Sequence, residues 1–313
     1  MSSKGSLRDS KGSEGGAPTE DPRHPLKTSQ DDADESVNRR LSVLISFAFG
    51  ARTCMESLRP DWEVMLDSGA FTNWSRGKDV VTMNGYMGFL LEHGHRFSHY
   101  LNLDRIGDPA KSQENLEYLQ GVGLSPVPVF QRGGTRAELE RLLDEHDLVA
   151  IGGISKTPQA KAEQAYLHQC MSIARGHKVH LLGVGWGPIL KYRPYSADCS
   201  TYAQTRMYGS LALWHRGGWV RFGKAPTTRG SKAYVRPDTK RTSALHAYGL
   251  TWADLGDADA WAKEGPVALA GIRGWIRFAA HAQRMGSRVV FVDHQRIHSA
   301  LTQAWEMERE AWT

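Results

Sequence analysis

The sequence predicts an α/β protein with a TIM-type (β/α)8 barrel. From residue 41 onward, short apolar runs alternate with longer amphipathic segments. The short runs are apolar on both faces, as are the strands of a parallel sheet covered by helices. Five runs end in polar or glycine-rich motifs: DSGAF (67–71), LDRIGDP (103–109), FQRGG (130–134), GGISK (152–156) and GVGWG (183–187). In a barrel these strand ends share one face, where active sites form. A doubly wound sheet also fits the alternation, but no GxGxxG follows the first strand, which favours the barrel.

The predicted elements follow from this pattern in chain order. Strands are expected at 41–49, 63–66, 99–104, 126–130, 148–154, 179–185 and 288–293. Helices are expected at 82–94, 109–123, 135–146, 158–176, 245–255, 267–285 and 295–311. The 109–123 helix has Pro109 near its start and Gly123 at its end, which are the usual boundary residues.

Two stretches lack this rhythm. Residues 1–40 are polar, carry 7 Lys or Arg against 8 Asp or Glu, and show no apolar periodicity. They cannot bury enough surface to offset chain entropy, so we predict a disordered tail followed by one barrel domain at 41–313. Residues 217–244 are predicted to be loop-like and contain seven Lys or Arg with one Asp.

Composition narrows the class of protein and its partners. The apolar runs are about strand length, short of the ~18–20 residues that a membrane span needs, and the N-terminal stretch lacks a signal-peptide core. We therefore expect a cytoplasmic protein without a membrane partner. Three cysteines without a CxxC pair argue against a disulfide framework and a four-thiolate zinc site. A sequence pI of about 9.1 suggests an anionic partner, most commonly nucleic acid.

Two carboxylates are candidates for catalysis. Asp198, in YSADCST, comes after the glycine-ended apolar run at 180–187, and it is either a nucleophile or a loop aspartate. Asp67 and Ser68 begin a tight turn whose backbone amides can face a ligand. The alternative for Asp67 is a cap of the following turn or helix.

Other strand-end residues are candidates for binding a flat base. A buried Asp104 and the amide of Gln131 could together read the hydrogen-bonding edge of a purine. Alternatively, Asp104 pairs with Arg105 or Arg193, and Gln131 caps a loop. Three glycines would let backbone groups approach such a ligand, or only shape turns: Gly152, Gly153 and Gly183.

The basic segment 217–244 is a candidate nucleic-acid surface. Its cations are interleaved with Trp219, Phe222 and Tyr234, which can stack on bases. The expected phosphate contacts are Arg221, Lys224, Arg229, Lys232 and Arg236. The alternative is an ordinary charged loop. The histidine cluster at 93–99 has no HExxH or Cys/His knuckle spacing, so no metal and no cofactor are predicted.

Five of these signatures resemble, in the same order, the tRNA-guanine transglycosylases, and most closely their phage and bacterial relatives, the deoxypurine-in-DNA protein A group. They are LDSGAF (66–71), LNLDRIGDP (101–109), PVFQRGG (128–134), AIGGI (150–154), and LLGVG (181–185) with YSADCST (195–201). The resemblance spans residues 62–206, about half of the chain.

The resemblance implies a pentosyltransferase that exchanges guanine in a polynucleotide for a 7-deazaguanine such as preQ0. Asp198 matches the nucleophile and Asp67 the general acid/base. The positions that recognise the base match Asp104, Gln131 and Gly153. Such chemistry is reasonable because one carboxylate can capture the oxocarbenium-like C1′ and a second can handle the protons of the bases.

Two departures from the family pattern affect the expected polymer. The CxCxxC…His zinc site of the tRNA-acting members has no counterpart here, so no zinc subdomain is expected. Ser-Thr-Tyr follows Asp198 and Cys199 without a proline, as in the DNA-associated branch. We therefore expect DNA as substrate, with a helicase-like ATPase as a possible partner protein. The alternatives are a tRNA-acting enzyme, a non-catalytic nucleic-acid-binding barrel, and an unrelated retaining glycosidase or N-glycosidase.

Overall fold

A computed structural model describes residues 40–312 except 155–160, 204, 206–207 and 225–236. Within helices and strands, the side chains of residues 52–54, 161 and 223–224 are also outside the description. All described residues belong to one compact unit, Glu35–Thr313. The predicted tail at 1–40 therefore lies almost entirely outside the described residues.

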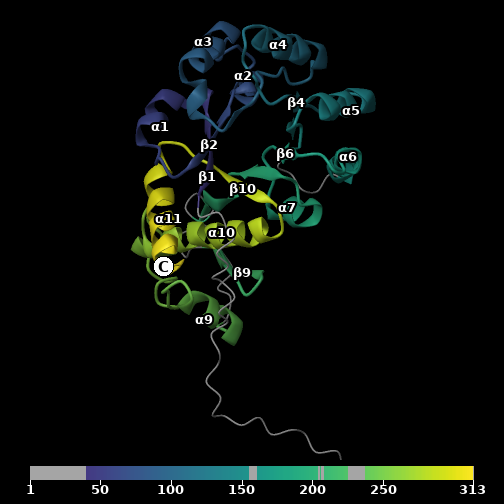
Figure 1. Cartoon of the computed structure of the whole chain (residues 1–313). Coiled ribbons are helices and arrows are strands. Elements are labelled where there is room, and N and C mark those ends of the chain that lie inside the picture. Colours follow the sequence, from purple (N-terminus) through teal and green to yellow (C-terminus); the bar gives the residue numbers. More distant parts are fainter. Residues whose placement is uncertain (1–39, 155–160, 204, 206–207, 225–236, 313) are drawn as a thin grey trace, which may run out of the picture. The chain divides into compact units, whose positions relative to one another are not determined.

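The unit contains a curled sheet of eight parallel strands in the order β3-β2-β1-β10-β7-β6-β5-β4 (Figure 1). In chain order the strands are β1 (Ser42–Ser46), β2 (Glu63–Asp67), β3 (His99–Tyr100), β4 (Val129–Phe130), β5 (Val149–Ile151), β6 (Val179–Leu181), β7 (Ser196–Cys199) and β10 (Arg288–Val292). The prediction of a parallel α/β sheet is confirmed.

Residues that flank the two terminal strands of this order form one bridge. Leu101, just after β3, forms a parallel bridge with Val127, just before β4. The Asn102 N–H donates to the Val127 carbonyl at 2.9 Å, and the Val127 N–H donates to the Tyr100 carbonyl at 2.8 Å.

Helices flank the sheet and alternate with its strands. They are α1 (Ala51–Ser57), α2 (Ala70–Arg76), α3 (Met83–His93), α4 (Pro109–Gly121), α5 (Arg136–Glu145), α6 (Lys161–Ile173), α7 (Trp186–Tyr192), α10 (Pro266–Arg284) and α11 (His298–Trp312). The local sequence explains where several of these helices begin. Thr135 and Glu138 form a capping box at α5, and Asp108 caps α4 ahead of Pro109. Short 3-10 turns complete the connections: η1 (Phe47–Phe49), η2 (Gly94–Arg96), η3 (Thr201–Ala203) and η4 (Asp259–Trp261).

The sheet has a separate apolar layer on each face. Strand side chains alternate between faces, so successive residues enter different layers. One small cluster collects residues from or beside the eight strands, and consists of Leu44, Met65, Leu101, Val127, Val129, Leu148, Ala150 and Val290, with Leu182, Tyr195 and Val292 packed against it. A larger cluster contains the alternate strand residues, such as Val43, Leu66 and Phe291, together with the helices. We call the first the inner layer and the second the outer layer.

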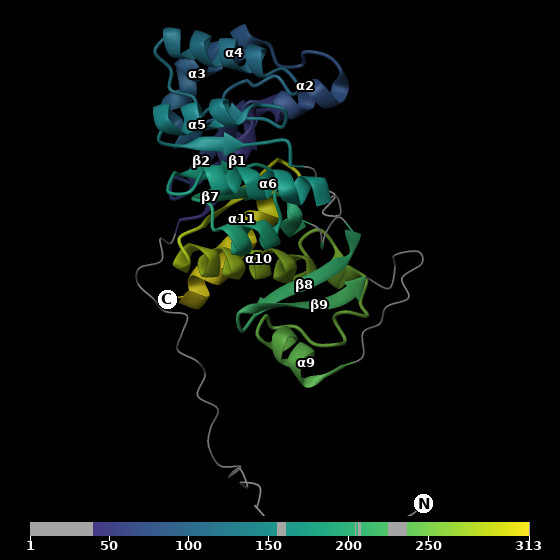
Figure 2. The same cartoon turned by 90° about the vertical axis from the view of Figure 1, so that its right-hand side faces the viewer.

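An insertion between β7 and α10 forms a second small core. It contains the antiparallel hairpin β8 (Ser210–His215) and β9 (Gly218–Lys224), followed by α9 (Thr239–His246). The hairpin lies against α10, with α9 on its other side (Figure 2). The glycine at 274 of α10 allows this close packing, because a Cβ there would lie in a tight contact 3.2 Å from the Ala212 carbonyl oxygen of β8.

Two sequence predictions fail in this insertion. Residues 217–244 were expected to be loop-like but contain β9 and α9. The expected helix at 245–255 is also wrong, since α9 ends at His246 and turns follow. Gly249 has a φ of +72° and breaks the helical path, and the Asp254 carboxylate accepts from the Thr251 N–H in a local turn. The strand β8 was not predicted.

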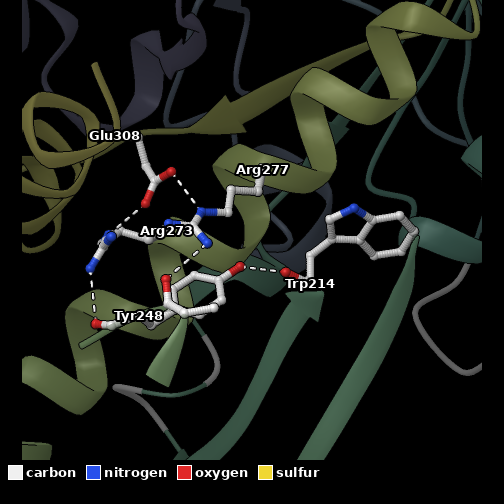
Figure 3. Close-up of polar contacts among 6 residues, drawn as sticks. Trp214, Tyr248, Arg273, Arg277 and Glu308 are labelled. Atoms are coloured by element: carbon white, nitrogen blue, oxygen red, sulfur yellow. Dashed lines mark hydrogen bonds and ion pairs between the residues drawn. The ribbon is translucent and has the colours of Figure 1, made fainter. Parts of the chain in front are cut away.

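A buried ionic cluster connects α10, α11 and the segment after α9 (Figure 3). Glu308 of α11 is fully buried and accepts from Arg273 Nε at 2.6 Å and from Arg277 Nε at 2.7 Å. Both guanidinium groups lie over the ring of Tyr248, whose hydroxyl donates to the Trp214 carbonyl of β8 at 2.5 Å. This cluster fixes the insertion to the helices that cover the sheet.

Among the described residues, no helix combines the length and the apolar character needed to cross a bilayer.

Candidate active site

Three acidic residues lie at the C-terminal ends of sheet strands. Asp67 is the last residue of β2, and Asp104 follows β3. Asp198 lies on β7 itself, which corrects its expected place beyond the end of the 179–185 strand. That strand ends at Leu181, and α7 separates it from β7. The chain can turn back because Arg193, the C-cap of α7, adopts a left-handed conformation.

Asp198 is a buried carboxylate with one backbone donor. The residue is 7% exposed, and its Oδ1 accepts from the Gly183 N–H at 2.8 Å. Gly183 has a φ of +66°, and open space lies where a Cβ would be. The glycine therefore turns its amide toward the carboxylate and leaves room beside it.

His180 is a neighbour of Asp198 that sequence reasoning missed. It lies on β6 opposite Ser196 of β7 and is fully buried. Its Nδ1 is 2.8 Å from Ser196 Oγ, while its Nε2 is 3.4 Å from Asp198 Oδ1 without forming a hydrogen bond of standard geometry. If the Ser196 hydroxyl donates to Nδ1, Nε2 carries the proton and faces the carboxylate. The only signal in the sequence was a histidine inside an otherwise apolar strand.

Asp67 is held in a setting that favours its protonated form. Its pKa is raised, first by burial and further by the negative charge of Asp198. The Gly69 amide and the Ser46 hydroxyl act in the opposite direction, although Ser46 Oγ lies outside hydrogen-bond geometry. Asp67 is half-buried as a residue.

Asp104 and Gln131 form a buried pair. Both residues are 7% exposed, and Gln131 Nε2 donates to Asp104 Oδ2 in a short hydrogen bond. Burial is the main reason that the pKa of Asp104 rises to about 7, and the charge of Asp67 contributes. The expected alternative of an Asp104–Arg105 pair is wrong, since Arg105 binds Asp79 at 2.6 Å.

Two glycines adjoin this pair. A Cβ on Gly152 would lie 2.9 Å from both terminal atoms of the Gln131 amide. Gly153 has a φ of +69°, and a Cβ there would lie 2.7 Å from Arg132 Cβ. The double glycine therefore makes room for the Gln131 side chain and the segment after it.

The other predicted site residues have no described contact with the three carboxylates or lie outside the described residues. Ser68 is buried, and its Oγ has no hydrogen-bond partner within the described residues. Arg221 is an exposed residue of the β9 hairpin, and its carbonyl accepts from Arg241. Lys224 ends β9, but its side chain is not described. Arg229, Lys232 and Arg236 lie outside the described residues.

Two further results concern metal binding and similarity to known proteins. No group of three or more His, Cys, Asp or Glu side chains in the described part of the chain is arranged to hold a metal ion. No protein-family model and no curated protein sequence matches this chain.

Proposed function

We propose that the protein is a guanine transglycosylase that replaces guanine in DNA with a 7-deazaguanine such as preQ0. We further propose that its sheet is a closed (β/α)8 barrel. The Leu101–Val127 bridge between the terminal strands and the inner apolar layer drawn from around the sheet support the barrel. The observation that carries the function is the convergence of Asp67, Asp104 and Asp198 at one end of the sheet, close enough that Asp198 raises the pKa of Asp67 and Asp67 raises the pKa of Asp104.

Asp198 is the proposed nucleophile. Loss of guanine from a nucleoside develops positive charge at C1′, which an adjacent carboxylate stabilises and then captures. The bond from C1′ to guanine N9 breaks as the bond from C1′ to an Asp198 oxygen forms. The incoming base reverses both changes, so the configuration at C1′ is retained. The Gly183 amide holds Oδ1 in place and leaves Oδ2 as the attacking oxygen.

Asp67 is the proposed proton donor and acceptor. A leaving guanine needs a proton, and an incoming deazaguanine must lose one, so a single carboxyl group can serve both half-reactions. Its raised pKa keeps a proton available when guanine departs. The two exchanges balance, and no further reactant is consumed.

The Asp104–Gln131 pair is the proposed reader of the base. Guanine and 7-deazaguanines share an edge with N1–H and N2–H donors and an O6 acceptor. An ionised Asp104 accepts from the donors, and the Gln131 amide supplies a donor and an acceptor beside it. A base inside a duplex cannot reach this site, so flipping or strand opening must precede exchange.

Nucleoside analysis tests the proposal. DNA and tRNA from cells that express the protein and are supplied with 7-deazaguanine precursors are digested and analysed by mass spectrometry. We expect a deazaguanine nucleoside in DNA, and none with Asp198→Asn. A modified base in tRNA alone would overturn the assignment to DNA. Unmodified DNA and tRNA with the wild-type protein would favour a non-catalytic binding module instead.

A further inference from the structure

Exposed aromatic rings lie on the segments that follow β1 and β2. Phe49 ends the η1 turn after β1, while Phe71 and Trp74 lie on α2 after β2. These residues are 58%, 63% and 58% exposed, respectively. Large rings left in water on a folded surface commonly mark a binding site. The segments after β6 and β7 add two more exposed rings, Trp186 and Tyr208.

The segments that carry the rings after β1 and β2 contact each other. The two segments touch at Gly69, where a Cβ would lie only 2.6 Å from Ala48 Cβ. The positive φ of Gly69, +91°, permits this close approach directly beyond Asp67. On α2 the rings of Phe71 and Trp74 contact each other, with centroids 5.6 Å apart.

Two cations accompany these rings. Arg76 ends α2, and Lys78 follows it; both are exposed. Neither forms a salt bridge with any acidic residue in the described ranges, and the nearby Asp79 is held by Arg105. We call Phe49, Phe71, Trp74, Arg76 and Lys78 the α2 rim.

We propose that the α2 rim binds unpaired nucleotides beside the reactive one, so that the polymer is taken as single-stranded DNA. A base offers its face to an aromatic ring only when it is unstacked from its neighbours, and stacking of this kind tolerates any sequence. Free cations beside the rings suit the backbone phosphates. The inference rests on the proposed function because that function places the reactive nucleotide over Asp67 and Asp198.

Binding to the full-length Asp198→Asn protein tests the inference without chemistry. The probe is a fluorescent oligodeoxynucleotide of about 15 nucleotides, offered single-stranded or as its duplex. We expect tighter binding of the single strand, and about tenfold weaker binding after Trp74→Ala. Trp74→Phe keeps a stacking ring and should restore most of the affinity. Tyr118→Ala is the matched control, since Tyr118 is 47% exposed on α4 and is not part of the rim.

The cations give a second readout. Arg76→Glu combined with Lys78→Glu should flatten the salt dependence of binding by about two phosphate contacts. Equal affinity for single strand and duplex would overturn the inference, as would a Trp74→Ala protein that binds as well as the Tyr118→Ala protein. If the wild-type chain exchanges bases but these binding effects are not seen, the proposed role of the α2 rim is wrong and the proposed function is not affected. Selective binding without exchange refutes the proposed function alone.

Discussion

The molecule buries acidic side chains in two places, and their partners differ. Glu308 faces two guanidinium groups that neutralise it and satisfy both of its oxygens. Asp67 and Asp104 form no salt bridge with a Lys or Arg in the described structure; the charge of Asp198 raises the pKa of Asp67, and the charge of Asp67 raises the pKa of Asp104. A buried carboxylate with two cations holds elements together, because removing its charge leaves others unpaired. Buried carboxyl groups without cations cost stability and gain reactivity, which is typical of a catalytic site.

The largest expected effect is the loss of stability when the carboxylate of Glu308 is removed. Glu308→Ala would leave Arg273 and Arg277 partly buried without their acceptor. We expect the free energy of unfolding to fall by about 3–5 kcal/mol. Chemical denaturation with far-UV circular dichroism measures this loss.

The matched control lies on the same helix. Glu306 is half exposed and pairs with Arg59 at 2.5 Å. An exposed pair contributes little, so Glu306→Ala should cost less than about 1 kcal/mol. Equal losses for the two variants would contradict a special role for the buried cluster.

The second expected effect is a gain in stability when the charge of Asp104 is removed. The pKa of Asp104 is about 7 in the folded protein and near 3.8 when unfolded. Between these values the folded state holds a proton that the unfolded state has lost, so stability falls as pH rises. Asp104→Asn removes this penalty and should stabilise the protein at pH 8 by on the order of 2–4 kcal/mol, with little gain near pH 4.

The same variant should lose base binding. An amide has one acceptor oxygen and a donor NH2 group, so it cannot present two acceptor oxygens to the N1–H and N2–H donors of guanine, and the KM for the base should rise. In the wild type, KM should rise as pH falls below about 7, where Asp104 takes up its proton. If the Asp104→Asn protein is stabilised equally at pH 4 and pH 8, the ionisation of Asp104 is not the cause of the fall in stability with rising pH.

The sequence predicted the sheet and the acidic residues for a physical reason. Parallel strands are apolar on both faces, and their C-terminal ends share an edge, so the motifs at 67–71, 103–109 and 130–134 had to meet there. The Leu101–Val127 bridge brings the segments after β3 and β4 together, and with them Asp104 and Gln131.

The parts that were not predicted depend on tertiary contacts. β8 and β9 are stabilised by α10 and α9, whose packing no local pattern reveals. The segment after α9 has helical composition but ends in turns at Gly249. His180 is placed by strand register, which brings it opposite Ser196 and beside Asp198.

A smaller effect concerns that histidine. His180→Leu removes the polar group facing Asp198 and leaves a side chain that fits a buried apolar site. We expect kcat to fall about tenfold, since a polar contact to a charged carboxylate contributes about 1.5 kcal/mol. KM for the base should stay unchanged, because His180 does not contact the Asp104–Gln131 pair in the described contacts. Ser196→Ala should give a smaller fall in kcat, and a change in KM alone would contradict this role.

The smallest expected effect distinguishes a role of Gln131 in binding the base from a role in stability. In Gly152→Ala the new methyl group would meet the end of the Gln131 side chain at 2.9 Å and turn its amide away from Asp104. That end is flexible, so the fold should lose little, while base affinity should fall by about 1 kcal/mol, roughly fivefold in KM. Gly187→Ala is the control, because open space lies where its Cβ would be. If both variants bind the base equally well, Gln131 does not read it.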